Sequence, residues 1–114
     1  MQLIFLVLNK VECLGQILAG FMEAGIKGAT VLDSTGMLNA VDRSEVEPPP
    51  IFGSLRKFLC FDHDNNKVVF AVVSEEQVKK ASEIVNTITG GLDQPNTGIL
   101  FTVPVGYVEG IVQY

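Results

Sequence analysis

The fold of this chain is decided by the stretch Leu3-Ile4-Phe5-Leu6-Val7-Leu8, in which every residue is apolar. The stretch Val68-Val69-Phe70-Ala71-Val72-Val73 repeats this pattern in the second half of the chain. Because successive side chains of a strand point to opposite faces of a sheet, both faces of these strands are apolar. A sheet with helices on one face usually carries polar residues on the other. The expected helices are too few to cover two faces, so we expect another copy of the chain to cover the second.

The length of 114 residues fits one domain that spans residues 1–114. No apolar run reaches the roughly 18 residues that a membrane-spanning helix needs, so we expect no direct membrane insertion. The N-terminus lacks the basic region and cleavage site of a signal peptide. The expected compartment is therefore the cytosol.

The net charge of −5 argues against nucleic acid as a partner, because affinity for nucleic acid comes mainly from neutralising phosphates. Lysine and arginine are adjacent only at Arg56-Lys57 and Lys79-Lys80. The two cysteines, Cys13 and Cys60, do not form a disulfide framework and are expected to be free thiols.

Hydrophobic periodicity and turn residues predict four strands and two long helices. The first helix should end at Gly25, and the second should start at the capping box Ser74-Glu75-Glu76-Gln77 and end at Gly90-Gly91. Pro104 cannot donate a ladder hydrogen bond, so the last strand should lie at an edge. The order predicts an α+β, ferredoxin-like split βαβ-βαβ fold with two helices on one face of a four-stranded antiparallel sheet. The expected strands are 2–9, 28–33, 67–73 and 99–105, and the expected helices are 11–25 and the segment after Ser74.

Residues 37–66 form a long connection between the two halves. Pro48-Pro49-Pro50 favours extended backbone. After it, helical spacing of apolar residues predicts a short helix over 51–59. Long connections of this kind are often functional. The segment is therefore either a packed surface excursion or a loop that docks a partner.

Three segments resemble the PII family of nitrogen-regulatory signalling proteins. Residues 23–31, Glu-Ala-Gly-Ile-Lys-Gly-Ala-Thr-Val, resemble its passage from the first helix to the second strand. Residues 97–105, Thr-Gly-Ile-Leu-Phe-Thr-Val-Pro-Val, resemble its last strand and the preceding turn, and Ser74 to Val78 lie where its second helix starts. The similarity covers nearly the whole chain, and residues 37–66 fall where PII proteins carry a mobile docking loop.

The resemblance implies a homotrimer whose sheets pack around the threefold axis. It also implies nucleotide binding in clefts between subunits, and control of a transporter or an enzyme through residues 37–66. The residues that it places near the ligand are Thr30, Ser34, Thr35, Gly36, Met37, Asn96, Thr97 and Gly98.

Cationic residues that the family uses for phosphates are replaced in this chain. Its Gly-x-Gly-Lys turn corresponds to Asn96-Thr97-Gly98-Ile99, so the lysine is absent, and its Lys-Gly-Phe-Gly-Arg-Gln run corresponds to Thr35 to Ala40, which has no arginine. The basic tail is also absent, and the only tyrosines are Tyr107 and Tyr114, outside the loop. Since triphosphates require positive charge, we expect ATP to bind weakly, although an adenine nucleotide remains a candidate effector.

No catalytic or metal-binding residues are predicted. Asp62-His63-Asp64-Asn65-Asn66 is typical of a solvated turn, and Cys60 with His63 lacks the third group of a nucleophilic site. Gly90-Gly91 and Gly98 are interpreted either as structural glycines or as a backbone-amide nest for an anion. The alternatives to a PII-like sensor are a trimeric interaction module without a ligand, or a metal-tolerance protein of related trimeric fold.

Overall fold

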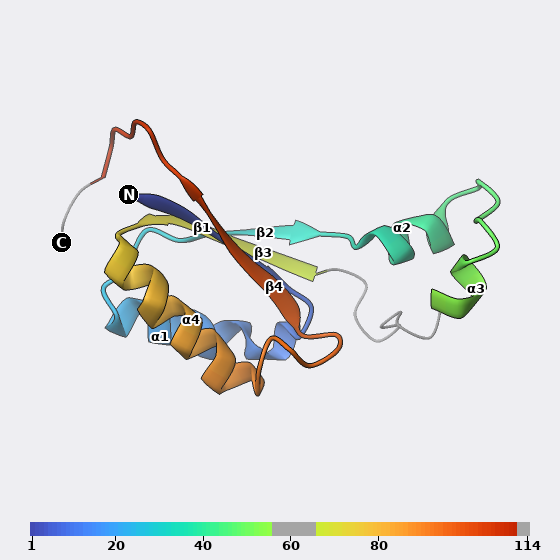
Figure 1. The fold of residues 1–114 in the computed structure, drawn as a ribbon, viewed down its shortest axis with the longest axis horizontal. Coiled ribbons are helices and arrows are strands. Elements are labelled where there is room, and N and C mark those ends of the chain that lie inside the picture. Colours follow the sequence, from blue (N-terminus) through green and yellow to red (C-terminus); the bar gives the residue numbers. More distant parts are fainter. Residues whose placement is uncertain (56–65, 112–114) are drawn as a thin grey trace.

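The computed structural model describes residues 1–55 and 66–111. Four strands alternate with helices along the chain (Figure 1). The strands are β1 (Gln2–Leu8), β2 (Thr30–Ser34), β3 (Asn66–Val73) and β4 (Gly98–Pro104). The helices are the short 3-10 turn η1 (Val11–Cys13), α1 (Leu14–Glu23), α2 (Met37–Arg43), α3 (Phe52–Leu55) and α4 (Glu75–Thr89).

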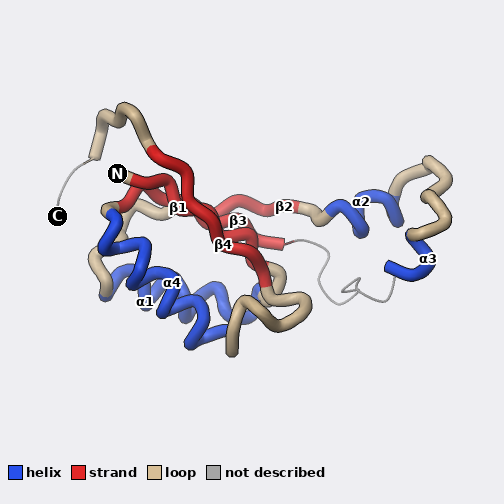
Figure 2. Tube along the Cα trace, viewed as in Figure 1, coloured by secondary structure: helices blue, strands red, loops and turns tan. Residues whose placement is uncertain are grey.

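The strands form one antiparallel sheet in the order β2-β3-β1-β4. Helices α1 and α4 lie side by side against one face of this sheet, and no helix covers the other face within the described residues (Figure 2). This arrangement confirms the predicted α+β, ferredoxin-like fold. Segment α2–α3 extends away from the sheet beyond the end of β2 (Figure 1), and we call residues 37–55 the arm.

The ends of α4 follow from local sequence. The Ser74 side chain accepts from the backbone N–H of Gln77, and the Gln77 side chain accepts from the backbone N–H of Ser74, which completes the predicted capping box. Gly90 adopts φ +88° and closes the helix in the left-handed conformation that glycine favours. Gly25, two residues after the last residue of α1, also adopts a positive φ, +85°.

The hydrophobic core lies between the sheet and the two long helices. Ile4, Leu6 and Leu8 of β1 are almost fully buried beneath α1 and α4. Helix α1 contributes Ile17 and Phe21, which are also buried. The remaining core residues on the sheet and on α4 are Val69, Ala71, Val73, Ala81 and Val85. The structure therefore settles which of the two alternating sets of strand residues faces the helices.

Several element boundaries differ from those predicted. The first helix begins as the turn η1, and β2 begins at Thr30 rather than at Gly28. Helix α2 was not expected, because its seven residues, Met37–Arg43, are too few to establish a helical period, and none of them is buried. Of the helix predicted over 51–59, residues 52–55 are helical, and residues 56–59 lie outside the described residues.

Candidate functional site

The face of the sheet that α1 and α4 leave uncovered is apolar. Register places one set of alternating residues from each strand on this open face. Its apolar members are Leu3, Phe5, Val7, Leu32, Val68, Phe70, Val72, Ile99, Phe101 and Val103. Four of them, Leu32, Ile99, Phe101 and Val103, are between 43% and 58% exposed in the single chain.

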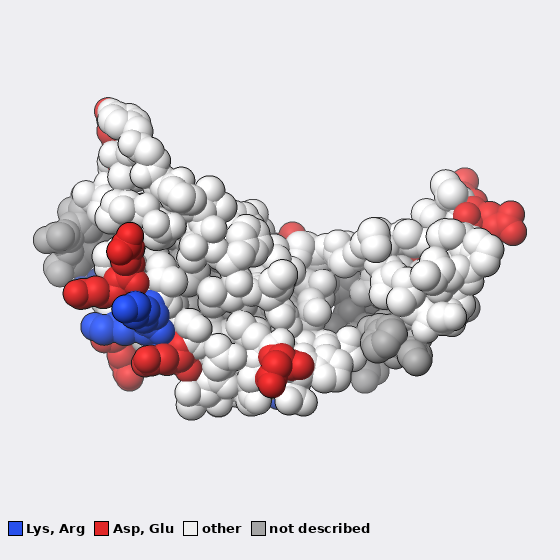
Figure 3. Space-filling view, in the orientation of Figure 1, with Lys and Arg blue, Asp and Glu red and all other residues white. Residues whose placement is uncertain are grey.

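Three phenyl rings stack across the middle of the open face. The ring centroid of Phe5 lies 5.7 Å from that of Phe70 and 5.3 Å from that of Phe101, with interplanar angles of 17° and 12°. No charged residue occupies a strand position on this face. Figure 3 shows charged atoms mainly near the helices and at the end of the arm, with few elsewhere on the visible side. A face without cations does not suit nucleic acid, whose backbone requires them.

Most of the predicted ligand residues lie at one end of the sheet, but on opposite edges. Ser34 pairs with Asn66 at the end of β2, while Leu8 lies opposite both Lys67 of β3 and Gly98 of β4. Strands β3 and β1 lie between the two edge strands. Three strand spacings of about 4.8 Å separate the edges by roughly 14 Å. A single chain therefore does not bring the two groups of predicted residues together.

The group at the β2 edge joins the sheet to the arm. Gly36 is the N-cap of α2, and a Cβ atom at this position would lie 3.2 Å from the Asn66 side-chain nitrogen. The hydroxyl of Ser34 is buried without a hydrogen-bond partner among the described residues. Met37 is 75% exposed, and Thr30 lies further back on β2, opposite Phe70. Thr35 separates Ser34 from the Gly36 cap.

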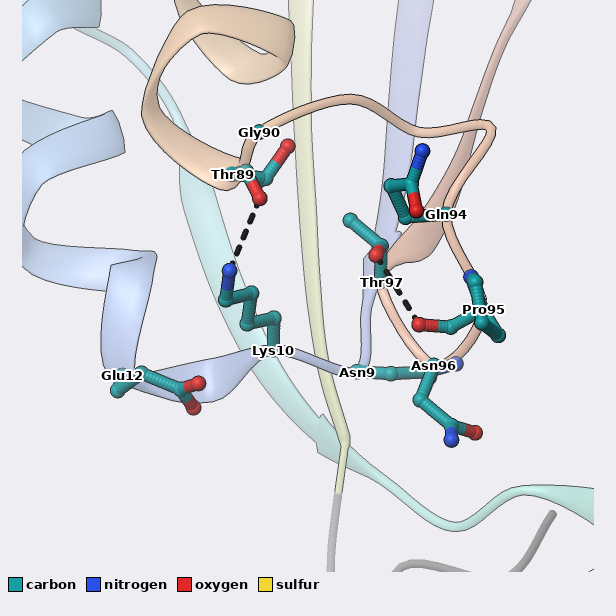
Figure 4. Close-up of a pocket in the computed structure, with 9 residues that line it drawn as sticks. All are labelled: Asn9, Lys10, Glu12, Thr89, Gly90, Gln94, Pro95, Asn96 and Thr97. Atoms are coloured by element: carbon teal, nitrogen blue, oxygen red, sulfur yellow. Dashed lines mark hydrogen bonds between the residues drawn. The ribbon is translucent and has the colours of Figure 1, made fainter.

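Of the group at the β4 edge, Asn96 and Thr97 line an open pocket of about 630 Å³, and Gly98 does not (Figure 4). One side of the pocket is formed by the segment after β1, with Lys10 and Glu12. The other side is formed by the loop between α4 and β4, which contributes Asn96 and Thr97. Among the described residues, the pocket is lined by Asn9, Lys10, Glu12, Thr89, Gly90, Gln94, Pro95, Asn96 and Thr97.

Lys10 is the charged pocket residue whose surroundings the structure explains best, and the sequence did not predict it as a site residue. Its ammonium group donates a hydrogen bond of 2.9 Å to the carbonyl of Thr89, the last residue of α4. The last turn of α4 has no basic residue of its own. Lys10 therefore places a positive charge at the negative end of the helix dipole. The signal that could have found it is its position directly after β1, at the end of the sheet where the loop before β4 also lies.

Several backbone groups of the 90–98 loop form hydrogen bonds within the chain. The N–H groups of Gly90, Gly91 and Leu92 donate to the Asn86 carbonyl, the Thr89 hydroxyl and the Asn86 side chain, respectively. The carbonyl of Thr97 accepts from the N–H groups of Asn9 and Lys10. These bonds favour the structural interpretation of Gly90-Gly91 over an anion nest. They leave Lys10 as the cationic group among the residues that line the pocket.

The described residues hold neither a cluster of metal-ligating side chains nor a membrane-spanning helix. In residues 1–55 and 66–111, no three His, Cys, Asp or Glu side chains gather as they would around a metal ion. Residues 60–65, which include Cys60, His63 and the Asp62-His63-Asp64-Asn65 turn, lie outside the described part of the chain. No helix in the described ranges combines the length and apolar character needed to cross a bilayer. No protein-family model and no curated protein sequence matches the chain.

Proposed function

We propose that this chain is a PII-like regulatory protein. It assembles as a homotrimer and senses a small cytosolic effector, such as an adenine nucleotide, between its subunits. It then regulates a transporter or an enzyme through residues 37–66. The observation that carries this proposal is the uncharged, apolar open face of the sheet, with its stack of three phenyl rings.

The open face supports self-assembly for a physical reason. Burying apolar surface contributes about 25 cal/mol per Å², and large exposed apolar patches mark interaction sites. A closed cyclic assembly buries such a face without forming open-ended filaments. The resemblance in residues 23–31 and 97–105 favours a threefold arrangement with the sheets facing the axis.

The arrangement of the site supports a ligand that binds between copies. Ser34, Thr35 and Gly36 lie at one edge of the sheet and Asn96 to Gly98 at the other, at the same end. In a ring of copies, the β2 edge of one subunit can lie beside the β4 edge of the next. The pocket that contains Lys10 would then be completed by residues at the base of a neighbour's arm.

The arm supports a regulatory output. Its first helix, α2, has Gly36 as its N-cap, directly after the predicted ligand residues at the end of β2, and the arm extends from the body of the molecule (Figure 1). Met37, Val46 and Ile51 are 75%, 74% and 62% exposed. Exposed apolar side chains on a projecting segment suit a partner surface. A ligand that contacts Gly36 would change the preferred position of this segment.

Thermal-shift measurements with adenine nucleotides test the sensor function. A ligand that binds only the folded protein raises the melting temperature by mass action, by an amount corresponding to about 2.7 kcal/mol at one hundred times its Kd. We expect at least one of AMP, ADP and ATP at millimolar concentration to raise the melting temperature. A trimer whose melting temperature changes with none of them would instead be the interaction module without a ligand.

A further inference from the structure

We propose that Lys10 recognises the ligand's anionic group, and that the pocket selects a nucleotide with one phosphate over a nucleotide with three. This inference rests on the proposed function and names the ligand class of its site. It follows from three observations on the pocket of Figure 4: the position of the cation, the neighbouring carboxylate and the size of the cavity.

The position of Lys10 suits contact with a ligand phosphate. Its ammonium group is held at the wall of the pocket by the bond to the Thr89 carbonyl. An ammonium group carries three N–H donors, and this bond uses one of them. The side chain is therefore oriented before a ligand arrives, which lowers the entropy lost on binding. Ile99, at the position where the resembled family has a phosphate-binding lysine, belongs to the open face and is 58% exposed.

The charge of the pocket limits how many phosphates it can hold. Lys10 is the cation and Glu12 is the carboxylate among its described lining residues, so their formal charges cancel. The whole chain carries a net charge of −5. The described residues that line the pocket within one chain include no second cation for the further negative charge of a triphosphate, so on this side of the site its desolvation is uncompensated. A single phosphate beside Lys10 leaves less negative charge uncompensated.

The size and the remaining lining groups of the pocket suit a nucleoside monophosphate. Small-molecule sites usually have volumes of about 300–1,000 Å³, and this pocket has about 630 Å³. The side-chain amides of Asn9, Gln94 and Asn96 also line it. Amides both donate and accept hydrogen bonds without adding charge, which suits the hydroxyl groups of a ribose and the edge of a base.

The test is calorimetric titration of the full-length chain with AMP, ATP and inorganic phosphate. We expect AMP to bind more tightly than ATP, because the triphosphate carries more negative charge that the pocket leaves unneutralised.

Lys10→Met keeps the aliphatic stem and removes the charge, and it should weaken AMP binding by about tenfold to one hundredfold. Lys10→Arg should keep AMP affinity within about threefold, because arginine retains the positive charge and the N–H donors. The matched control is Lys80→Met, which removes an exposed lysine of α4 outside the pocket and should leave AMP affinity unchanged.

The melting temperature of each unliganded variant shows whether it folds. If Lys10→Met does not fold, the AMP affinity of the Lys10→Arg variant is measured in its place. AMP binding that is equal in the wild-type and Lys10→Met proteins would overturn this inference and leave the proposed function intact. ATP binding at least tenfold more tightly than AMP would overturn it in the same way. Binding of inorganic phosphate but not of AMP would show that the site takes the anion without a nucleoside, which overturns the nucleotide assignment. Silence of the wild-type protein toward all three probes would contradict the proposed sensor function itself.

Discussion

Replacing Phe70 by aspartate is expected to convert the assembled protein into monomers that still fold. Phe70 lies on the open face, and its ring stacks against that of Phe5 at the centre of the sheet. In a trimer that buries this face, the new carboxylate would lose its water without gaining a partner, which costs several kcal/mol per copy. In the monomer the same carboxylate stays in contact with solvent, because the helices cover the opposite face. Light scattering coupled to size-exclusion chromatography measures the mass, and circular dichroism checks the fold.

Two variants separate loss of assembly from loss of folding. Met22→Asp changes a 66% exposed apolar residue of α1, on the other layer of the molecule, and should leave the assembly intact. Val69→Asp places the same charge in the core, next to Phe70 in sequence but facing the helices, and should unfold the chain. A Phe70→Asp protein that stays assembled, with wild-type mass at micromolar concentration, would refute burial of the open face between copies.

Replacing Gly98 by alanine is expected to destabilise the fold by about 1–3 kcal/mol. Gly98 has φ +152°, a conformation that residues with a Cβ atom rarely adopt. A Cβ atom at this position would also lie 2.5 Å from the carbonyl oxygen of Val7, a backbone atom of the central strand β1. Because a backbone atom cannot move aside as a flexible side chain can, β4 would have to shift away from β1. Thermal unfolding at a fixed chain concentration should show a fall of roughly 5–15 °C.

Gly15 provides the matched control for this substitution. It lies in α1, and no atom lies within 4 Å of a Cβ atom built there. Gly15→Ala should raise the stability by about 0.5–1 kcal/mol, because alanine is the better helix former. If Gly98→Ala is as stable as wild type, the close approach of β4 to β1 is not a constraint. The glycine would then be explained by contact with a ligand instead.

The parts of the fold that could be predicted from sequence are those with strong local signals. The fully apolar stretches 3–8 and 68–73 became the two central strands. Ser74 to Gln77 formed both bonds of the capping box, and Pro104 ended an edge strand. The capping box acts within a few residues, and a wholly apolar run must be buried whichever elements cover it, so both signals can be recognised without knowing the rest of the fold.

The parts that could not be predicted depend on tertiary contacts or lack a pattern. Which alternating set of β1 residues faces the helices is decided only by how α1 and α4 pack, because both sets are apolar. Helix α2 has only seven residues, too few to establish a helical period, and none of them is buried. Lys10 entered the site through a bond to Thr89, 79 residues away in sequence. The resemblance identified Asn96 and Thr97, but not the lysine that lies across the pocket from them.

Native mass spectrometry of the unmodified chain at micromolar concentration tests the central claim most directly. Burial of the open face requires assembly, and so does a site formed by the β2 edge of one copy and the β4 edge of the next. The account predicts one dominant species with three times the 12.3 kDa mass of the chain, stable on dilution through the micromolar range. A dominant species at 12.3 kDa would contradict it, because a monomer leaves the apolar face exposed and the two groups of site residues apart.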